Sequence, residues 1–169
     1  GQIIIDDQKI TVNLGVIYNG EGVRNNITDP FNHYNGKIGI EIRGSSTQMF
    51  PKKQYGVETR DANGNDLDVS LLGFPAESDW IFYAPYTDKS LMRNFLAYSL
   101  ARTMGRYATR CKYFELVINN DYKGIYILFE KIKRDKNRVN IKKIEPTDIS
   151  GDALTGGYII KIDKWTGEG

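Results

Sequence analysis

The residues best suited to bind an anion form a short polar turn between two strand-like segments. The turn holds a glycine, two serines and a threonine, and a Lys-Lys pair follows it. Exposed backbone N–H groups, hydroxyls and ammonium groups together suit an anionic ligand, phosphate above all. Six residues are therefore candidate phosphate contacts: Arg43, Gly44, Ser45, Ser46, Lys52 and Lys53. The alternative is an ordinary solvated hairpin, because Gly, Ser and Lys turn easily and stay hydrated.

The segments that must position this turn have the period of two that is typical of half-buried strands. Ile38, Ile40 and Ile42 alternate with small or charged residues before the turn, and Tyr55 and Val57 resume the alternation after it. The pattern predicts a hairpin with the polar turn at its tip.

The rest of the chain predicts many strands and one helix. Strands are expected at residues 3–5, 11–18, 79–84, 113–118, 124–129 and 158–162, with a loop at 19–36, a turn at 61–66, an apolar plug at 71–75 and a hairpin turn at 119–123. The helix is expected from Asp88 to Gly105, with Thr87 or Asp88 as its cap and Gly105 as the left-handed residue after its last turn. Its apolar residues cover a wide stripe, which predicts extensive burial.

The order of these elements predicts an α+β domain that spans residues 1–169. It consists of a mainly antiparallel sheet with one long helix packed on it. The same order of strands, helix and antiparallel pair occurs in the small lobe of protein kinases.

Composition and charge exclude several classes of function. The net charge of +2 gives no overall field that favours nucleic acid as a partner. Residues 131–143 hold seven basic residues and one acid but no aromatic residue for stacking on bases, so they form a solvated basic face or dock an acidic or phosphorylated partner. The lone His33 and Cys111 exclude a zinc site, a His-based nucleophile system and an internal disulfide framework. No apolar stretch approaches the roughly 20 residues of a membrane span.

Seven blocks of the sequence resemble the CotH kinase family, which is named for spore coat protein H. They are RGSS (43–46), FPKKQY (50–55), LGFPA (72–76), DWIFYAPYTDKSLMRN (79–94), YKGIY (122–126), EKIK (130–133) and RVNI (138–141). The blocks stand in the family's order and cover nearly the whole chain, from Ile38 to Asp163. Residues 106–141 are also similar to the versions common in Bacteroidetes-type surface proteins.

The resemblance implies an atypical kinase-like fold that binds ATP with Mg²⁺ and phosphorylates serine on other proteins. It further implies a bacterial protein that is secreted or held at the cell surface, with its signal peptide removed, and a protein substrate of serine or acidic character. The polar turn would cover the nucleotide, Lys53 or Lys52 would contact phosphate, and the helix would orient them. Glu130 and Lys131, where a hinge to a large lobe would begin, are further candidate nucleotide contacts. The alternative is that these two side chains only point to opposite sides of a strand end.

The chain departs from ordinary protein kinases in three ways. The turn has no G-x-G-x-x-G, the next strand has no V-A-I-K, and the helix has no Glu to pair with a strand lysine. Glu58 or Glu130, from strands, would have to supply that ion pair. Arg134, Asp135 and Asn140 match the spacing of a kinase catalytic loop, but neither the preceding His nor a following Asp-Phe-Gly is present, so the match is interpreted as coincidence.

The catalytic and metal-binding aspartates that the resemblance implies are expected beyond Gly169. The chain is therefore interpreted as the N-terminal part of a larger domain, with no metal ligand of its own. Asp163, a late acid in a predicted strand, is expected to be a solvent-facing strand end. The alternative function is a non-catalytic surface or structural module that has kept the fold. A carbohydrate-binding module is less favoured, because Trp80 lies in an apolar run and Trp165 stands alone.

Overall fold

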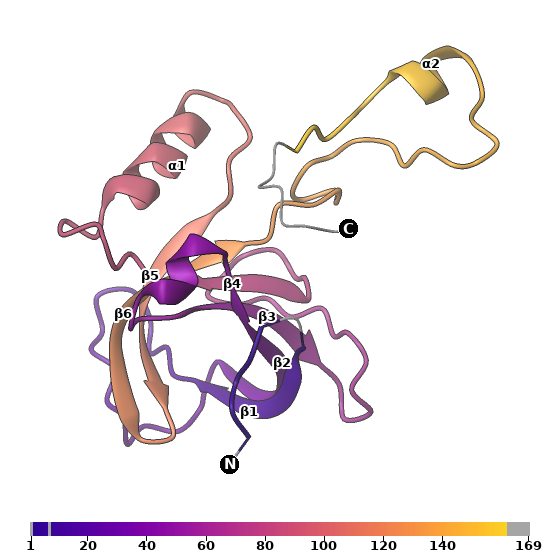
Figure 1. Ribbon diagram of the computed structural model, residues 1–169. Coiled ribbons are helices and arrows are strands. Elements are labelled where there is room, and N and C mark those ends of the chain that lie inside the picture. The colour runs from indigo at the N-terminus through magenta and orange to yellow at the C-terminus, as the bar shows by residue number, and fades with distance from the viewer. Residues whose placement is uncertain (1, 7, 162–169) are drawn as a thin grey trace. The chain divides into compact units, whose positions relative to one another are not determined.

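The computed structural model describes residues 2–6 and 8–161. The chain divides into two compact units between Lys131 and Ile132, and each is described by itself. The first unit contains a curled, antiparallel six-stranded sheet in the order β1-β2-β3-β4-β6-β5 (Figure 1). Its strands are β1 (Ile10–Val16), β2 (Tyr34–Arg43), β3 (Gln54–Arg60), β4 (Asp79–Tyr83), β5 (Cys111–Ile118) and β6 (Asp121–Glu130), with the helix α1 at Arg93–Thr103 and a 3₁₀ turn, η1, at Ser46–Met49.

The core lies on one face of this sheet, where alternate residues of neighbouring strands meet. Ile40 of β2 lies opposite Val57 of β3, which in turn lies opposite Trp80 of β4. Their exposed fractions are 4%, 1% and 1%. The predicted hairpin is therefore confirmed, because the period of two fixes which side chains turn inward. Residues of the predicted apolar plug, Leu71 and Phe74, are also buried in this core.

The last two strands form a hairpin that is tighter than predicted. Ile118 pairs with Asp121, so that Asn119 and Asn120 alone form the turn. Both have positive φ angles, 52° and 63°, which asparagine tolerates better than most residues and which match the twist of an antiparallel pair. The predicted strand at residues 3–5 is wrong. The described residues of this segment form no strand: Ile42 N donates to Ile5 O at 2.9 Å, and Asp6 makes an isolated bridge with Ile42.

The helix α1 begins five residues later than predicted. Residues 88–91 form a turn first, in which Asp88 Oδ1 accepts hydrogen bonds from the Ser90 amide and hydroxyl, and Leu91 has a φ of 59°. Asp88 Oδ2 then accepts from Arg93 N at 2.8 Å, so the carboxylate still satisfies a free amide at the start of the helix. Gly105, with a φ of 72°, ends the helix as predicted.

The predicted extensive burial of this helix is wrong. No residue of α1 is buried, and Leu96 and Leu100 are 58% and 56% exposed. Two ring contacts connect it to the sheet: Phe95 stacks on Tyr113 at 4.7 Å, and Tyr98 meets Phe129 edge to face at 5.2 Å. Apolar periodicity identified the helix, but the sheet has aromatic partners for only one side of it. The fold is α+β and mostly β, with short helices in place of one long packed helix.

The second unit, described as far as residue 161, has little regular structure. It contains the short helix α2 (Gly151–Thr155) and a parallel bridge between Arg134 and Val139. The predicted strand at 158–162 is wrong for residues 158–161, which are irregular, since none of the described strands pairs with them. Asp163 and Trp165 lie outside the described residues.

Candidate functional site

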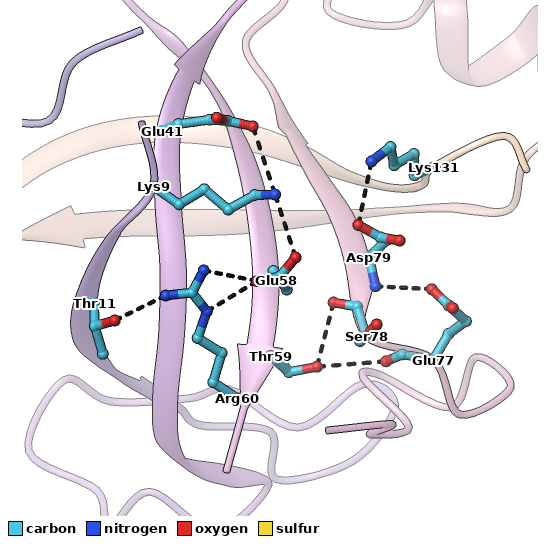
Figure 2. A network of polar contacts seen from close by, with 10 residues as sticks. All are labelled: Lys9, Thr11, Glu41, Glu58, Thr59, Arg60, Glu77, Ser78, Asp79 and Lys131. Atoms are coloured by element: carbon cyan, nitrogen blue, oxygen red, sulfur yellow. Dashed lines mark hydrogen bonds and ion pairs between the residues drawn. The ribbon is translucent and has the colours of Figure 1, made fainter. Parts of the chain in front are cut away.

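The face of the sheet opposite the core carries a group of charged side chains, here called the charged face. They come from β2, β3, β4 and the segments next to β1 and β6 (Figure 2). The members are Lys9, Glu41, Arg43, Glu58, Arg60, Asp79 and Lys131. The same alternation that buries Ile38 and Ile40 of β2 and Val57 of β3 on one side therefore places charges on the other.

Glu58 is the centre of this face. Its carboxylate lies 2.7 Å from Arg60 Nη2 and 3.3 Å from Lys9 Nζ, and Lys9 also lies 3.8 Å from Glu41. Arg60 Nη1 donates to the Thr11 hydroxyl at 2.8 Å, which ties β3 to β1 across β2. Burial opposes ionisation of Glu58, but the hydrogen bonds and charges of Arg60 and Lys9 outweigh it and lower the pKa of the carboxyl.

Two glycines let these side chains lie flat on the strands. A Cβ at Gly39 would be 2.5 Å from Arg60 Cζ, and a Cβ at Gly56 would be 2.9 Å from Glu41 Oε1. Gly39 lies opposite Glu58, and Gly56 lies opposite Glu41. The missing side chains therefore make the space in which neighbouring strands form their ion pairs.

A second ion pair lies where β4 begins and β6 ends. Lys131 Nζ is 3.3 Å from Asp79 Oδ1, and the Lys131 side chain is 53% exposed. The backbone N–H of Asp79 donates to Glu77 Oε2 at 2.7 Å, which fixes the entry to β4 (Figure 2). On the core side, the buried Thr59 hydroxyl donates to Leu67 O at 2.6 Å and anchors the loop after β3.

Arg43 ends β2 beside the polar turn. Within the described part of the chain its side chain makes no hydrogen bond or ion pair, and Glu41 and Tyr98 lie near enough to interact with it electrostatically. It lines a small pocket of about 60 Å³ with Lys9, Glu41, Asp79 and other residues of this face. A guanidinium with unused donors in such a setting is suited to a bidentate anion.

The polar turn itself is compact. Gly44 has a φ of 103°, and a Cβ there would overlap the Thr47 hydroxyl, so position 44 requires glycine. Ser45 and Ser46 are exposed, and Ser46 begins η1. The buried Thr47 Oγ1 has no hydrogen-bond partner among the described residues.

The two predicted lysines bind backbone carbonyls. Lys53 Nζ donates to Gln48 O at 2.5 Å, which closes the turn on itself. Lys52 Nζ donates to Ile125 O at 2.6 Å and lies 4.7 Å from the centre of the Tyr126 ring. Burial lowers the pKa of Lys52. The structure thus brings Arg43 and Lys131 onto the charged face, while Lys53 closes the polar turn and Lys52 ties the segment after it to β6.

Glu130 and Lys131 point to opposite sides of the strand end. The Glu130 side chain is fully buried on the core side, where it lies 2.8 Å from Arg110 Nη1 and also accepts from Arg110 N at 3.0 Å. Lys131 lies on the charged face. Of the two strand acids expected to supply an ion pair, Glu58 is paired with Lys9 and Arg60, and Glu130 with Arg110.

Sequence analysis missed four members of the charged face, Lys9, Glu41, Arg60 and Asp79, and also Arg110, the partner of Glu130. Lys9 and Asp79 are far from the polar turn in sequence, and Arg110 lies just before β5. No local sequence pattern therefore connects these residues to their ion-pair partners. The sequence offered one signal for this charged face: β3 has charged residues at alternate positions, Glu58 and Arg60, and the small residue Gly39 of β2 lies opposite Glu58.

The charged face offers no site for Mg²⁺. The carboxylates of Glu58 and Asp79 are each held by a cation, Glu58 by Lys9 and Arg60 and Asp79 by Lys131. Across residues 2–6 and 8–161, no cluster of three or more His, Cys, Asp or Glu side chains could hold a metal ion. No role for a metal is therefore derived from these residues.

A family model described as CotH kinase protein matches residues 40–168, which is well over half of the chain. The chain belongs to the CotH kinase family. Membership implies the use of ATP, and the matched span contains the polar turn and most of the charged face, with Lys9 before it. A search of curated proteins gave no match. Among the described helices of this CotH kinase family member, none is long and apolar enough to cross a membrane.

Proposed function

We propose that this chain is the nucleotide-binding small lobe of an atypical serine protein kinase. ATP binds with its phosphates at the end of the charged face that carries Arg43 and the polar turn. In the complete protein, catalytic and metal-binding acids come from residues outside this chain. Family membership supports ATP as the ligand, and the Arg43 guanidinium, which makes no hydrogen bond or ion pair within the described residues, supports phosphate binding beside it.

Phosphoryl transfer depends mostly on positioning the nucleotide and neutralising phosphate charge. Arg43 supplies a fixed positive charge with donors in a planar fork, which matches two phosphate oxygens. Gly44 exposes backbone at the neighbouring position, and Ser45 and Ser46 add hydroxyl donors within the same turn. Lys9 and Arg60 offset the charges of Glu41 and Glu58 on the strands beneath, so that the phosphates compete with no excess of acids.

The family resemblance supports the protein substrate and the location that we propose. We propose a serine-bearing substrate on surface or coat proteins, and a protein that acts outside the bacterial cell or at its surface. Lys52, Lys53, Glu130 and Lys131 stay predicted nucleotide contacts. Among these, Lys131 is the best placed, because its side chain is 53% exposed on the charged face.

Calorimetric titration of the chain with ATP and Mg²⁺ tests the proposal. We expect saturable binding that Arg43→Ala weakens about tenfold or more, because a hydrogen bond to a charged group contributes about 1.5–3 kcal/mol. Arg24→Ala is the matched control, since Arg24 is exposed in the loop before β2. Binding that is the same in both variants would contradict the assignment of Arg43. Absence of binding would favour the non-catalytic module.

A further inference from the structure

One cross-strand row connects the charged face with the part of the sheet that contacts α1. Glu41 lies opposite Gly56, which lies opposite Ile81. Ile81 in turn lies opposite Phe129. Residues in one such row point to the same side of an antiparallel sheet. Tyr98 of α1 meets Phe129 edge to face at 5.2 Å, so the helix packs on the same side of the sheet as the charged face.

The packing of rings on the sheet holds the Tyr98 side chain in place. Its ring contacts Phe129, which is 5% exposed and stacks on Tyr83 with ring centres 5.1 Å apart and planes at 15°. Tyr98 is partly buried, and its hydroxyl makes no hydrogen bond within the described part of the chain. The ring is therefore fixed, while the hydroxyl has a donor and an acceptor to spare.

Tyr98 also lies near enough to Arg43 to interact with it electrostatically. Glu41 lies near Arg43 as well, but the Glu41 carboxylate is 3.8 Å from Lys9 Nζ. The helix itself, residues 93–103, contains no Asp or Glu. The helix thus presents a neutral hydroxyl, and not a carboxylate, to the guanidinium. A neutral acceptor can orient a guanidinium and leave its positive charge available for an anion.

The attachment of α1 to the sheet is weak, which makes it sensitive to contacts at Tyr98. No residue of the helix is buried. Apart from Tyr98, the attachment includes the stacking of Phe95 on Tyr113 at 4.7 Å and the hydrogen bond from the Tyr113 hydroxyl to Leu91 O at 2.9 Å. Elements with so little buried surface open at low free-energy cost and respond to ligands that bind at their contacts.

We propose that Tyr98 is a positioning residue for Arg43 and couples α1 to the bound nucleotide. The hydroxyl orients the guanidinium. In the nucleotide complex it accepts a hydrogen bond from one edge of the planar fork, while the other edge binds the phosphates. This inference rests on the proposed function, in which ATP phosphates bind beside Arg43. Coupling between two sites is reciprocal, so ATP stabilises α1 and a firmly attached α1 strengthens ATP binding.

Tyr98→Phe tests the hydroxyl, because the variant keeps the ring contact with Phe129. We expect the affinity for ATP in the presence of Mg²⁺, measured by calorimetry, to fall about fivefold, the effect of one hydrogen bond. In the Arg43→Ala background the same change should alter affinity less than about twofold, since its effect passes through Arg43. A purely structural role of Tyr98 would give the same loss in both backgrounds.

Tyr113→Phe is the matched control. It also removes a hydroxyl that lies between the sheet and α1, but Tyr113 is on β5, at the edge of the sheet farthest from β1 and separated from β2 by three strands. Its affinity for ATP should equal that of the wild type. Hydrogen exchange in residues 93–103 should slow when ATP binds to the wild type, and clearly less in Tyr98→Phe. Thermal unfolding checks that both variants fold.

A measurement without nucleotide separates this inference from the proposed function. In the ¹⁵N-labelled chain, the Nε–H signal of Arg43, identified by its loss in Arg43→Ala, should shift in Tyr98→Phe and stay in place in Tyr113→Phe. If the wild type does not bind ATP, the proposed function and the coupling to nucleotide are overturned, and the Arg43 signal still decides the contact. The positioning role is overturned if Tyr98→Phe leaves the Arg43 signal and ATP affinity unchanged, or if the two variants behave alike.

Discussion

The two halves of one sheet face differ sharply in what holds them together. On β2, β3 and the start of β4, the residues opposite the core are Glu41, Glu58 and Asp79, joined by ion pairs. On the rest of β4 and on β5 and β6, they include Tyr83, Phe129 and Tyr113, which stack with one another or with α1. The same alternation thus gives a wet, charged half and a drier, aromatic half.

This difference separates function from stability. Ring packing in the aromatic half removes apolar area from water and should contribute several kcal/mol. Ion pairs in the charged half are partly solvated and should contribute about 1 kcal/mol or less each. The charged side chains of this half can therefore bind a ligand and change their ion-pair partners while the protein stays folded.

The largest effect on stability is expected from the aromatic half. Phe129 is 5% exposed and contacts Tyr83 at 5.1 Å and Tyr98 at 5.2 Å. Phe129→Ala should lower the free energy of unfolding by about 3–5 kcal/mol and loosen α1, as measured by urea unfolding. A loss below about 1 kcal/mol would mean that the aromatic half does not carry the stability of this face.

A smaller effect is expected where a glycine makes room for an ion pair. Gly39→Ala should cost about 2 kcal/mol, because its Cβ would displace the Arg60 guanidinium from Glu58. In a double-mutant cycle, Arg60→Ala should remove most of this cost, since the overlapping atoms are gone. If the losses of stability from Gly39→Ala and Arg60→Ala simply add, then the backbone conformation of the strand, and not the space needed by the ion pair, is the reason for glycine at position 39.

The smallest effect on stability is expected from the charge at the centre of the charged half. Glu58→Gln should lower the free energy of unfolding by about 1 kcal/mol at neutral pH. Because the folded-state pKa of Glu58 lies below its usual value of 4.5, its stabilisation is present above that pH and is lost as pH falls through the folded pKa.

The difference between wild type and Glu58→Gln, measured by urea unfolding at a series of pH values, should therefore shrink below about pH 4.5. Glu21→Gln, in an exposed loop, should show no such difference at any pH. If the difference in unfolding free energy between wild type and Glu58→Gln stays constant from neutral to acidic pH, the charge of Glu58 is not what stabilises the strands.

The sequence predicted the parts of this comparison that depend on local patterns. Alternation at Ile38–Ile42 predicted the β2–β3 hairpin and its core face, and Gly105 was predicted from its left-handed backbone preference. A hairpin turn was predicted at 119–123, but only Asn119 and Asn120 form it. The sequence did not predict ion pairs between residues that are far apart in the chain and come together only in the folded structure, such as Lys9 with Glu58. The predicted first residue of α1 was wrong because Asp88 first closes a separate turn. The predicted burial of α1 was wrong because periodicity identifies an apolar stripe but does not show whether another element covers it.

The central claim is that nucleotide binds at the charged half, beside Arg43. It is tested most directly by NMR of the isotope-labelled chain during titration with ATP and Mg²⁺. The largest backbone amide shifts should occur at Glu41–Thr47, with smaller ones near Lys131 and near Tyr98, which interacts electrostatically with Arg43, and the amides of the β5–β6 turn should change little. Shifts that cluster on α1 and β5 instead, or no shifts at saturating nucleotide, would contradict the account.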